Sequence, residues 1–217
     1  AFRLVDAEKA LAEAKASEER WIKGEPAGLV DGVPSTIKDL VDTIGWSTRR
    51  GSLTTSDNGT WENDAPLVAR LRENGAVLLG KTTTPEFGWK GVTDSPLTGI
   101  TRNPWNPEKT PGGSSGGAAA AAAACLGALH HGSDGGGSIR MPSGYTGIYG
   151  LKPTFGRVPT WPASGFGTLS HQGPMTRTVS DAALMLTVMA QTDSRDWYAL
   201  PASETNWSSY VTKSVKG

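Results

Sequence analysis

Apolar residues near the start of the chain recur at the spacing of one helix face. The stripe consists of Leu4, Val5, Ala7, Ala10, Leu11, Ala14 and Ala16, with charged residues between them. A period of three to four residues is typical of an amphipathic helix. The pattern therefore predicts a helix over residues 2–21.

A short apolar, β-branched run follows at residues 29–40, LVDGVPSTIKDL. Its glycine and proline favour a turn, and the residues after them favour a buried strand. The pattern predicts that Lys38 lies on this strand, next to apolar residues such as Val33 and Ile37.

The segment DAPLVARLRENGAVLLGKT predicts a helix followed by a strand. Asp64 is the expected N-cap, Pro66 lies in the first turn, and Gly75 ends the helix. The apolar residues 76–79 then form a buried strand, so the segment is half of a β-α-β crossover.

The middle of the chain combines a long loop with an alanine-rich helix. Glycine, proline, threonine and asparagine dominate residues 82–117, and an ordered loop of that length inside a domain is usually functional. Residues 117–129 favour a helix because alanine has the highest helix propensity. Since this helix has no polar face, we expect it to be fully buried.

After a second glycine-rich loop, the pattern predicts three further segments. Residues 147–159 favour a strand and a turn, and residues 160–175 are irregular. Residues 178–191 favour a helix capped by Ser180. Helices and strands thus alternate along the chain, which indicates an α/β fold.

Charge and length limit the classes of partner. The 217 residues include 21 basic and 21 acidic residues, and neither sign forms a long block. This balance gives no electrostatic support for binding nucleic acid or an anionic membrane. The most apolar stretch, residues 118–129, is shorter than the roughly 20 residues that cross a bilayer. We therefore expect no nucleic-acid or membrane partner, and instead a neutral small molecule or a protein.

The single cysteine, Cys125, excludes an internal disulfide and fits a reducing compartment, so we expect a cytoplasmic protein. Its place in the alanine run predicts a packing role. The three histidines and the cysteine lack metal-ligand spacing, so we expect no metal and no other cofactor. Residues 1–20 resemble a helix from the middle of a protein, and we expect a segment upstream of them.

Two motifs of known serine hydrolases occur in the chain and remain alternatives. Residues 112–116, GGSSG, match the G-x-S-x-G elbow of α/β-hydrolases, whose histidine could only be His171. Residues 35–38 form S-x-x-K, residues 56–58 form S-D-N and residues 81–83 resemble K-T-G, in the order used by serine β-lactamases and penicillin-binding proteins. The S-x-x-K and S-D-N motifs lie too close together in the sequence to leave room for the helical domain that the β-lactamase fold requires between them.

A buried lysine is the leading candidate for a catalytic base. The pKa of lysine, near 10.4 in water, can fall by several units on burial, and a neutral amine can then accept the proton of a serine. Lys38 has the most buried sequence context of the lysines. The alternative is a strand lysine that pairs with Asp39 or Asp31.

The glycine-rich loop SDGGGSIR, residues 133–140, is a candidate oxyanion hole. Consecutive backbone N–H groups in a turn can converge on one oxygen, and glycine leaves the approach of a substrate unobstructed. Asp134 and Arg140 are expected to brace the loop. The candidate donors are the N–H groups of Gly135, Gly136, Gly137 and Ser138.

Long stretches of the chain resemble the amidase signature family. They include GVPSTIKDL around Lys38, GGSSGG before the alanine-rich helix, DGGGSIRMPSGYTGIYGLKPTFGRV after it, and GPMTRTVSDAALML near the end. The resemblance covers residues 31–193. It implies an α/β amidase signature fold, with a mixed β-sheet core covered by helices, and the hydrolysis of a small-molecule carboxylic amide. It also implies that residues 1–217 belong to one domain.

The resemblance further implies a Ser-cisSer-Lys triad. Lys38 would be the base, Ser114 the bridging serine in a cis peptide linkage, and Ser138 the nucleophile that forms an acyl-enzyme. The alanine-rich helix would be the buried spacer that lets both serine loops meet over the lysine.

Two departures from the family pattern stand out. Ala118 occupies a position where the family often has serine, and Gly135 one where it usually has a larger residue. Members of the family are also longer, so we expect the C-terminal part of the domain to be missing from this chain.

Other functions remain open. One is that of the glutamine-hydrolysing A subunit of a tRNA-dependent amidotransferase, although that protein commonly has SLDQIGP where this chain has TLSHQGP. Another is an inactive scaffold or binding fragment. The sequence specifies neither the amide nor the oligomeric state, a homo-oligomer included. Four aromatic residues near the loops could line an acyl pocket or simply pack, namely Trp89, Trp105, Trp161 and Phe166.

Overall fold

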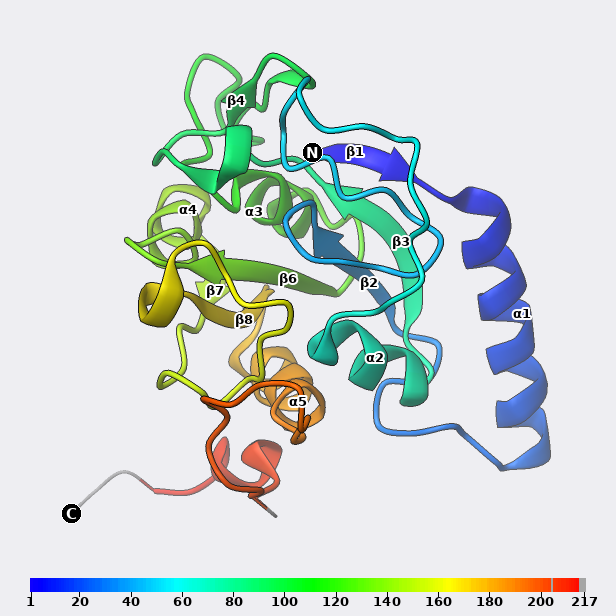
Figure 1. The fold of residues 1–217 in the computed structure, drawn as a ribbon. Helices are drawn as coiled ribbons and strands as arrows, with labels where there is room; N and C mark the ends of the chain where they lie inside the picture. The colour runs from blue at the N-terminus through cyan, green and yellow to red at the C-terminus, as the bar shows by residue number, and fades with distance from the viewer. Residues whose placement is uncertain (204, 215–217) are drawn as a thin grey trace.

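A computed structural model describes residues 1–203 and 205–214. Its core is a six-stranded sheet in the order β1-β3-β2-β6-β8-β7 (Figure 1). Strand β2 runs parallel to β3 and β6, and the other neighbours are antiparallel. The predicted mixed sheet of an α/β fold is therefore confirmed. The strands are β1 (Phe2–Val5), β2 (Pro34–Lys38), β3 (Val77–Thr82), β6 (Leu129–Asp134), β7 (Tyr149–Gly150) and β8 (His171–Thr176), and a separate hairpin pairs β4 (Asp94–Ser95) with β5 (Gly99–Ile100).

Helices cover both faces of the sheet (Figure 1). One face carries α3 and α4, with a small core that includes Ala119 and Met175. The other face carries α2 and α5, with a larger core that includes Leu71 and Met185. In the described part of the chain, no helix has the length and apolar character needed to span a membrane. The α-helices are α1 (Ala7–Lys23), α2 (Pro66–Glu73), α3 (Gly116–Ala123), α4 (Arg140–Thr146) and α5 (Val179–Met189), and short 3-10 turns lie at Glu86–Gly88, Gly167–Leu169 and Trp207–Tyr210.

The start of the chain differs from its prediction. Residues 2–5 form strand β1, which pairs with β3, and α1 begins only after Asp6, whose side chain accepts the N–H of Lys9. On α1 only Ala10 and Ser17 are buried, while Leu11 is 72% exposed. The predicted apolar stripe fails because α1 lies along the edge of the sheet next to β3, where Ala10 and Ser17 are buried and Glu13 accepts the backbone N–H of Leu78.

Two predicted helix caps are also wrong. The carboxylate of Asp64 does not cap α2, because it accepts the backbone N–H of Ile44 and the guanidinium of Arg72. Thr178 caps α5 in place of Ser180, and its hydroxyl accepts the N–H of the residue three positions on. In both cases a neighbouring residue takes the cap position, so the helices themselves form as predicted.

The C-terminal half contains one strand that the pattern missed. Residues 171–176, predicted to be irregular, form β8 between β6 and β7. Conversely, the strand predicted within residues 147–159 is only two residues long. Gly173 and Pro174 obscure the strand signal of β8, whose burial between two neighbours stabilises it.

The alanine-rich helix is buried up to its last residue, close to the prediction, but it is shorter than predicted. Residues 116–122 are all buried, α3 ends at Ala123, and Leu129 already belongs to β6. Cys125 lies in the turn after the helix, has a φ of 58° and is exposed. The prediction that Cys125 packs inside the helix is therefore wrong.

Small side chains on α3 are needed because the helix packs closely on the sheet. Ala119 is fully buried against Ile139 and Met175. We predict that Ala119→Leu lowers the free energy of unfolding by about 1–3 kcal/mol, because the added atoms have no room. Urea unfolding followed by circular dichroism measures the change. The matched control is Ala14→Leu on the exposed side of α1, expected within about 0.5 kcal/mol of the parent. Equal losses in both variants would contradict the close packing.

Candidate active site

The candidate site forms where parallel strands end. Lys38 is the last residue of β2, and the next strand, β6, runs parallel to it and carries Ser133 near its own carboxyl end. Ser114 and Ser115 directly precede α3 and close the site from the face that this helix covers. Residues that lie far apart in the sequence thus meet at one edge of the sheet.

The Lys38 side chain is fully buried and surrounded by hydroxyl groups. Its Nζ donates hydrogen bonds to the Oγ atoms of Ser114 (2.7 Å), Ser115 (2.8 Å) and Ser133 (2.9 Å). The structure therefore brings together two of the three predicted triad residues.

The alternative, in which Lys38 pairs with a neighbouring carboxylate, is wrong. Asp39 binds the guanidinium of Arg3, and Asp31 binds that of Arg20. Among the described residues, Lys38 has no ion-pair partner.

Burial lowers the pKa of Lys38 to about 7, and only the negative charge of Asp134 opposes this effect. The neutral amine is then populated near pH 7. A neutral amine has two N–H groups and one lone pair, so it can donate to two of the hydroxyls and accept the proton of the third. The site thus contains a base near neutral pH.

The hydrogen bonds distinguish Ser114 from Ser115. The Ser115 hydroxyl donates to the backbone carbonyl of Ser133 (3.1 Å) and accepts the Ser133 N–H (3.2 Å), so its proton is already used. The Ser114 hydroxyl bonds only to Lys38 among the described residues. Ser114 is therefore free to pass a proton to the amine.

The loop before α3 has the conformation that the resemblance implies. The peptide bond between Gly113 and Ser114 is cis. A Cβ atom at Gly113 would lie 2.7 Å from the backbone of Val92, so only glycine fits at this position.

Ser138 lies in the second loop and lines the same cavity as Ser114. The cavity has a volume of about 620 Å³. A backbone hydrogen bond from Ser115 N–H to the Ser138 carbonyl (3.2 Å) joins the two loops. Within the described residues the Ser138 hydroxyl has no hydrogen-bond partner, so it is available to a molecule in the cavity.

Asp134 holds the second loop, as predicted. Its buried carboxylate accepts the N–H groups of Gly137 (2.7 Å) and Ile139 (3.1 Å) and forms an ion pair with Arg140. Burial opposes ionisation of this carboxyl, but the Arg140 guanidinium and the backbone donors outweigh it and lower its pKa to about 2. The loop is therefore braced by a permanently charged group.

The hydrogen bonds of Asp134 leave only some of the predicted oxyanion donors available to a ligand. The N–H of Gly137 is bound to Asp134. The N–H groups of Gly135, Gly136 and Ser138 have no partner among the described residues, and all three residues line the cavity. These three N–H groups remain as candidates to bind an oxyanion.

Sequence reasoning missed Ser115 and Ser133 as partners of Lys38. The sequence held one signal that could have identified Ser133. The alternation of side chains along a strand places His131 and Ser133 on the same face of β6. His131 accepts the backbone N–H of Lys38 (3.3 Å) and binds the side-chain oxygen of Gln172 (2.8 Å). Burial lowers the pKa of His131 to about 3, so the ring is neutral and positions the lysine strand.

The two alternative serine-hydrolase arrangements do not form. His171 Nδ1 lies next to the carbonyl oxygens of Leu169 and Asp134, and no serine binds it among the described residues. The Ser35 hydroxyl donates to the carbonyl of Val33, whereas the hydroxyls that bond to the Lys38 amine are those of Ser114, Ser115 and Ser133. In the described part of the chain, no group of three or more potential metal ligands lies together.

Three of the four candidate aromatic residues line the cavity, namely Trp89, Trp161 and Phe166. Trp105 does not, because its indole N–H donates to the carbonyl of Thr146 outside the cavity.

Comparison with known proteins finds a matching family model and similar curated proteins. A family model described as Amidase matches residues 1–217. The chain is 44% identical to an indoleacetamide hydrolase of Bradyrhizobium diazoefficiens, over 92% of this chain and 39% of that protein. It is 42% identical to the A subunit of a glutamyl-tRNA(Gln) amidotransferase of Pediococcus pentosaceus, over 100% of this chain and 44% of that protein.

The fold is also similar to that of a solved structure. The crystal structure of a bacterial aryl acylamidase, described as a member of the amidase signature enzymes, superposes with a TM-score of 0.89 at 35% identity. The match covers 99% of this chain and 45% of the acylamidase. The chain thus spans less than half the length of the proteins it matches.

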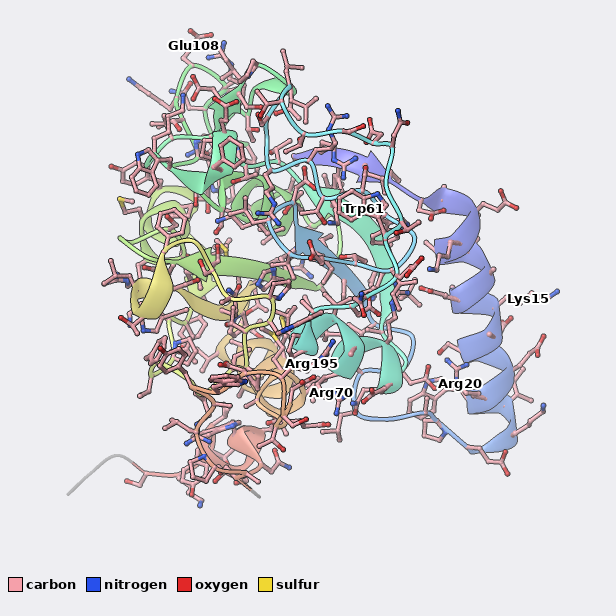
Figure 2. All side chains as sticks on the ribbon, in the orientation of Figure 1. Lys15, Arg20, Trp61, Arg70, Glu108 and Arg195 are labelled. Atoms are coloured by element: carbon pink, nitrogen blue, oxygen red, sulfur yellow. The ribbon has the colours of Figure 1, made fainter. Side chains whose placement is uncertain are left out.

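We predict that Lys38 titrates near pH 7, whereas an exposed lysine titrates near 10.4. NMR of protein labelled with 13C at the lysine Cε measures each pKa. Lys15, which points away from the sheet on α1, serves as an exposed lysine to check that the label is incorporated (Figure 2). Lys81, also fully buried, has its pKa lowered to about 7 by burial, so two signals should titrate early. Lys38→Met should remove one of them. Loss of a signal that titrates near 10 would contradict the assignment.

Proposed function

Because the chain belongs to the amidase signature family, we propose that it carries the active site of a serine amidase that hydrolyses a carboxylic amide. The observation that carries the proposal is the buried, carboxylate-free Lys38, which contacts Ser114 at the wall of a cavity that also exposes Ser138. The substrate is a small molecule, and the reaction needs no cofactor.

The first step is the activation of Ser138. The neutral amine of Lys38 accepts the proton of Ser114, and Ser114 accepts the proton of Ser138. The Ser138 oxygen attacks the amide carbonyl carbon and forms a tetrahedral intermediate. A pKa of about 7 suits this role, because the amine is then a competent base without giving up the ability to release the proton.

The developing oxyanion is stabilised by the second loop. The free N–H groups of Gly135, Gly136 and Ser138 line the cavity and can donate to one oxygen. The Gly137 N–H, a candidate donor from the sequence, serves the loop through Asp134 instead.

Collapse of the intermediate breaks the carbon–nitrogen bond. The proton returns from Lys38 through Ser114 to the leaving nitrogen, so the amine departs neutral. Water then attacks the ester carbonyl of the acyl-enzyme, the relay takes its proton, and the carboxylic acid leaves as Ser138 regains its hydrogen.

A second candidate is glutamine hydrolysis as part of an amidotransferase. It is supported by the 42% identity, along the whole chain, to a protein of that name from Pediococcus pentosaceus. The chemistry would be the same, with glutamine as the amide and ammonia as the product.

We predict that a fluorophosphonate probe labels the protein once, at Ser138. Ser138→Ala should abolish the adduct, and Ser114→Ala should slow labelling by roughly 10²–10⁴-fold, the usual contribution of a positioned proton acceptor. Intact-mass and peptide mass spectrometry measure both effects. Ser56→Ala, which changes an exposed serine outside the cavity, is the control. An adduct that persists on Ser114 in the Ser138→Ala protein would refute the nucleophile.

Ammonia release from two substrates separates the two candidate functions. We predict that the protein hydrolyses a simple amide such as phenylacetamide faster than glutamine, because His171 and Gln172 replace the residues common in the glutamine-hydrolysing amidotransferases. A coupled glutamate dehydrogenase assay measures ammonia from both. Hydrolysis of glutamine alone would favour the amidotransferase.

A further inference from the structure

Gly135 is one of the glycines in the cavity wall that the backbone does not require. By contrast, the backbone does require a glycine at position 88, next to Ser114. Gly88 has a φ of +71°, and a Cβ there would lie 2.7 Å from the side chain of Leu40. Gly135 has no positive φ, and a Cβ there would make only ordinary contacts, the nearest at 3.7 Å. A larger residue would therefore fit at position 135 without strain.

The neighbours of Gly135 decide where such a side chain would go. The contacts at 3.7 Å are the carbonyl oxygen of Leu169 and Cδ1 of Phe166. These atoms block one side, so the outer atoms of a longer side chain would extend into the cavity that Gly135 and Ser138 both line. Glycine leaves this space to the substrate, beside the carbonyl that Ser138 attacks.

The wall next to this space is aromatic. Phe166 stacks on Trp89, with ring centroids 5.0 Å apart and planes at 26°. Trp89 is 76% exposed, and both rings line the cavity. Aromatic faces and edges favour contact with another aromatic ring over contact with water.

The charged groups of the cavity are paired, so they do not select a charged substrate. Lys90 binds Asp94 at 2.5 Å, and Arg50 lies 3.9 Å from Asp42. A neutral ligand can then occupy the cavity without leaving a buried charge unpaired.

We propose that Gly135 and Phe166 together set the width of the cavity beside Ser138 and admit an aromatic group attached next to the scissile carbonyl. The substrate class is the neutral arylacetic or aryl carboxylic amide. This inference rests on the proposed amidase function and makes Gly135 and Phe166 specificity-determining residues.

The experiment compares the kcat/KM of the purified protein for phenylacetamide and for acetamide, and uses their ratio. The parent protein should prefer phenylacetamide. Gly135→Val should lower the ratio at least tenfold, because the added methyl groups occupy the space of the ring, and Gly135→Ala should have a smaller effect. Phe166→Ala should also lower the ratio, because the aromatic wall is lost.

A double variant tests whether the two residues bound the same space. In Gly135→Val/Phe166→Ala, removal of the ring gives the valine room, so the loss should be smaller than the product of the two single losses. If the two substitutions instead damaged the structure independently, their losses in the kcat/KM ratio would multiply. Gly144→Ala on α4, outside the cavity, also adds a Cβ that would meet nothing within 4 Å, so it is the control for replacing a glycine, and its ratio should equal that of the parent.

A binding measurement keeps the test decisive where turnover is slow. Benzylboronic and methylboronic acids form tetrahedral adducts with a nucleophilic serine, and the ratio of their Ki values should change in the same order across the variants. An unchanged ratio in Gly135→Val, with either pair of ligands, would overturn the proposal. Failure of the parent protein to hydrolyse either amide or to react with the fluorophosphonate probe would instead overturn the proposed function.

Discussion

The site depends on one constraint, the burial of the Lys38 amine among hydroxyl groups, where no carboxylate of the described residues forms an ion pair with it. Burial removes water from the ammonium and lowers its pKa to about 7. The three serine hydroxyls satisfy its hydrogen-bonding groups without fixing a positive charge. A carboxylate in direct contact would stabilise the ammonium and raise its pKa.

Lys81 shows why burial alone does not make a site. It is also fully buried, and burial lowers its pKa to about 7. Its Nζ, however, donates to the Val41 carbonyl and lies 3.8 Å from Asp39. It does not line the cavity, so no substrate reaches it. The difference between the two lysines lies in what surrounds them and in access.

Close packing around the two serine loops explains why glycine and alanine are common there. Gly113 fits against Val92, and the alanine residues of α3 let the helix approach the sheet closely. Asp134 then holds the second loop through backbone N–H groups and Arg140. The two loops are thus positioned by packing and by the buried Asp134 carboxylate, while three N–H groups of the second loop have no partner among the described residues.

The sequence by itself determined the α/β class, the buried alanine helix, the strand that carries Lys38, and the brace between Asp134 and Arg140, because local periodicity and short spacing encode them. It did not determine β1, β8 or the helix caps, since strand pairing and competing hydrogen bonds decide those. Only the tertiary structure placed Ser115 and Ser133 around Lys38 and assigned the Gly137 N–H to Asp134. Such contacts join residues far apart in the chain or depend on loop geometry, and no local pattern records either.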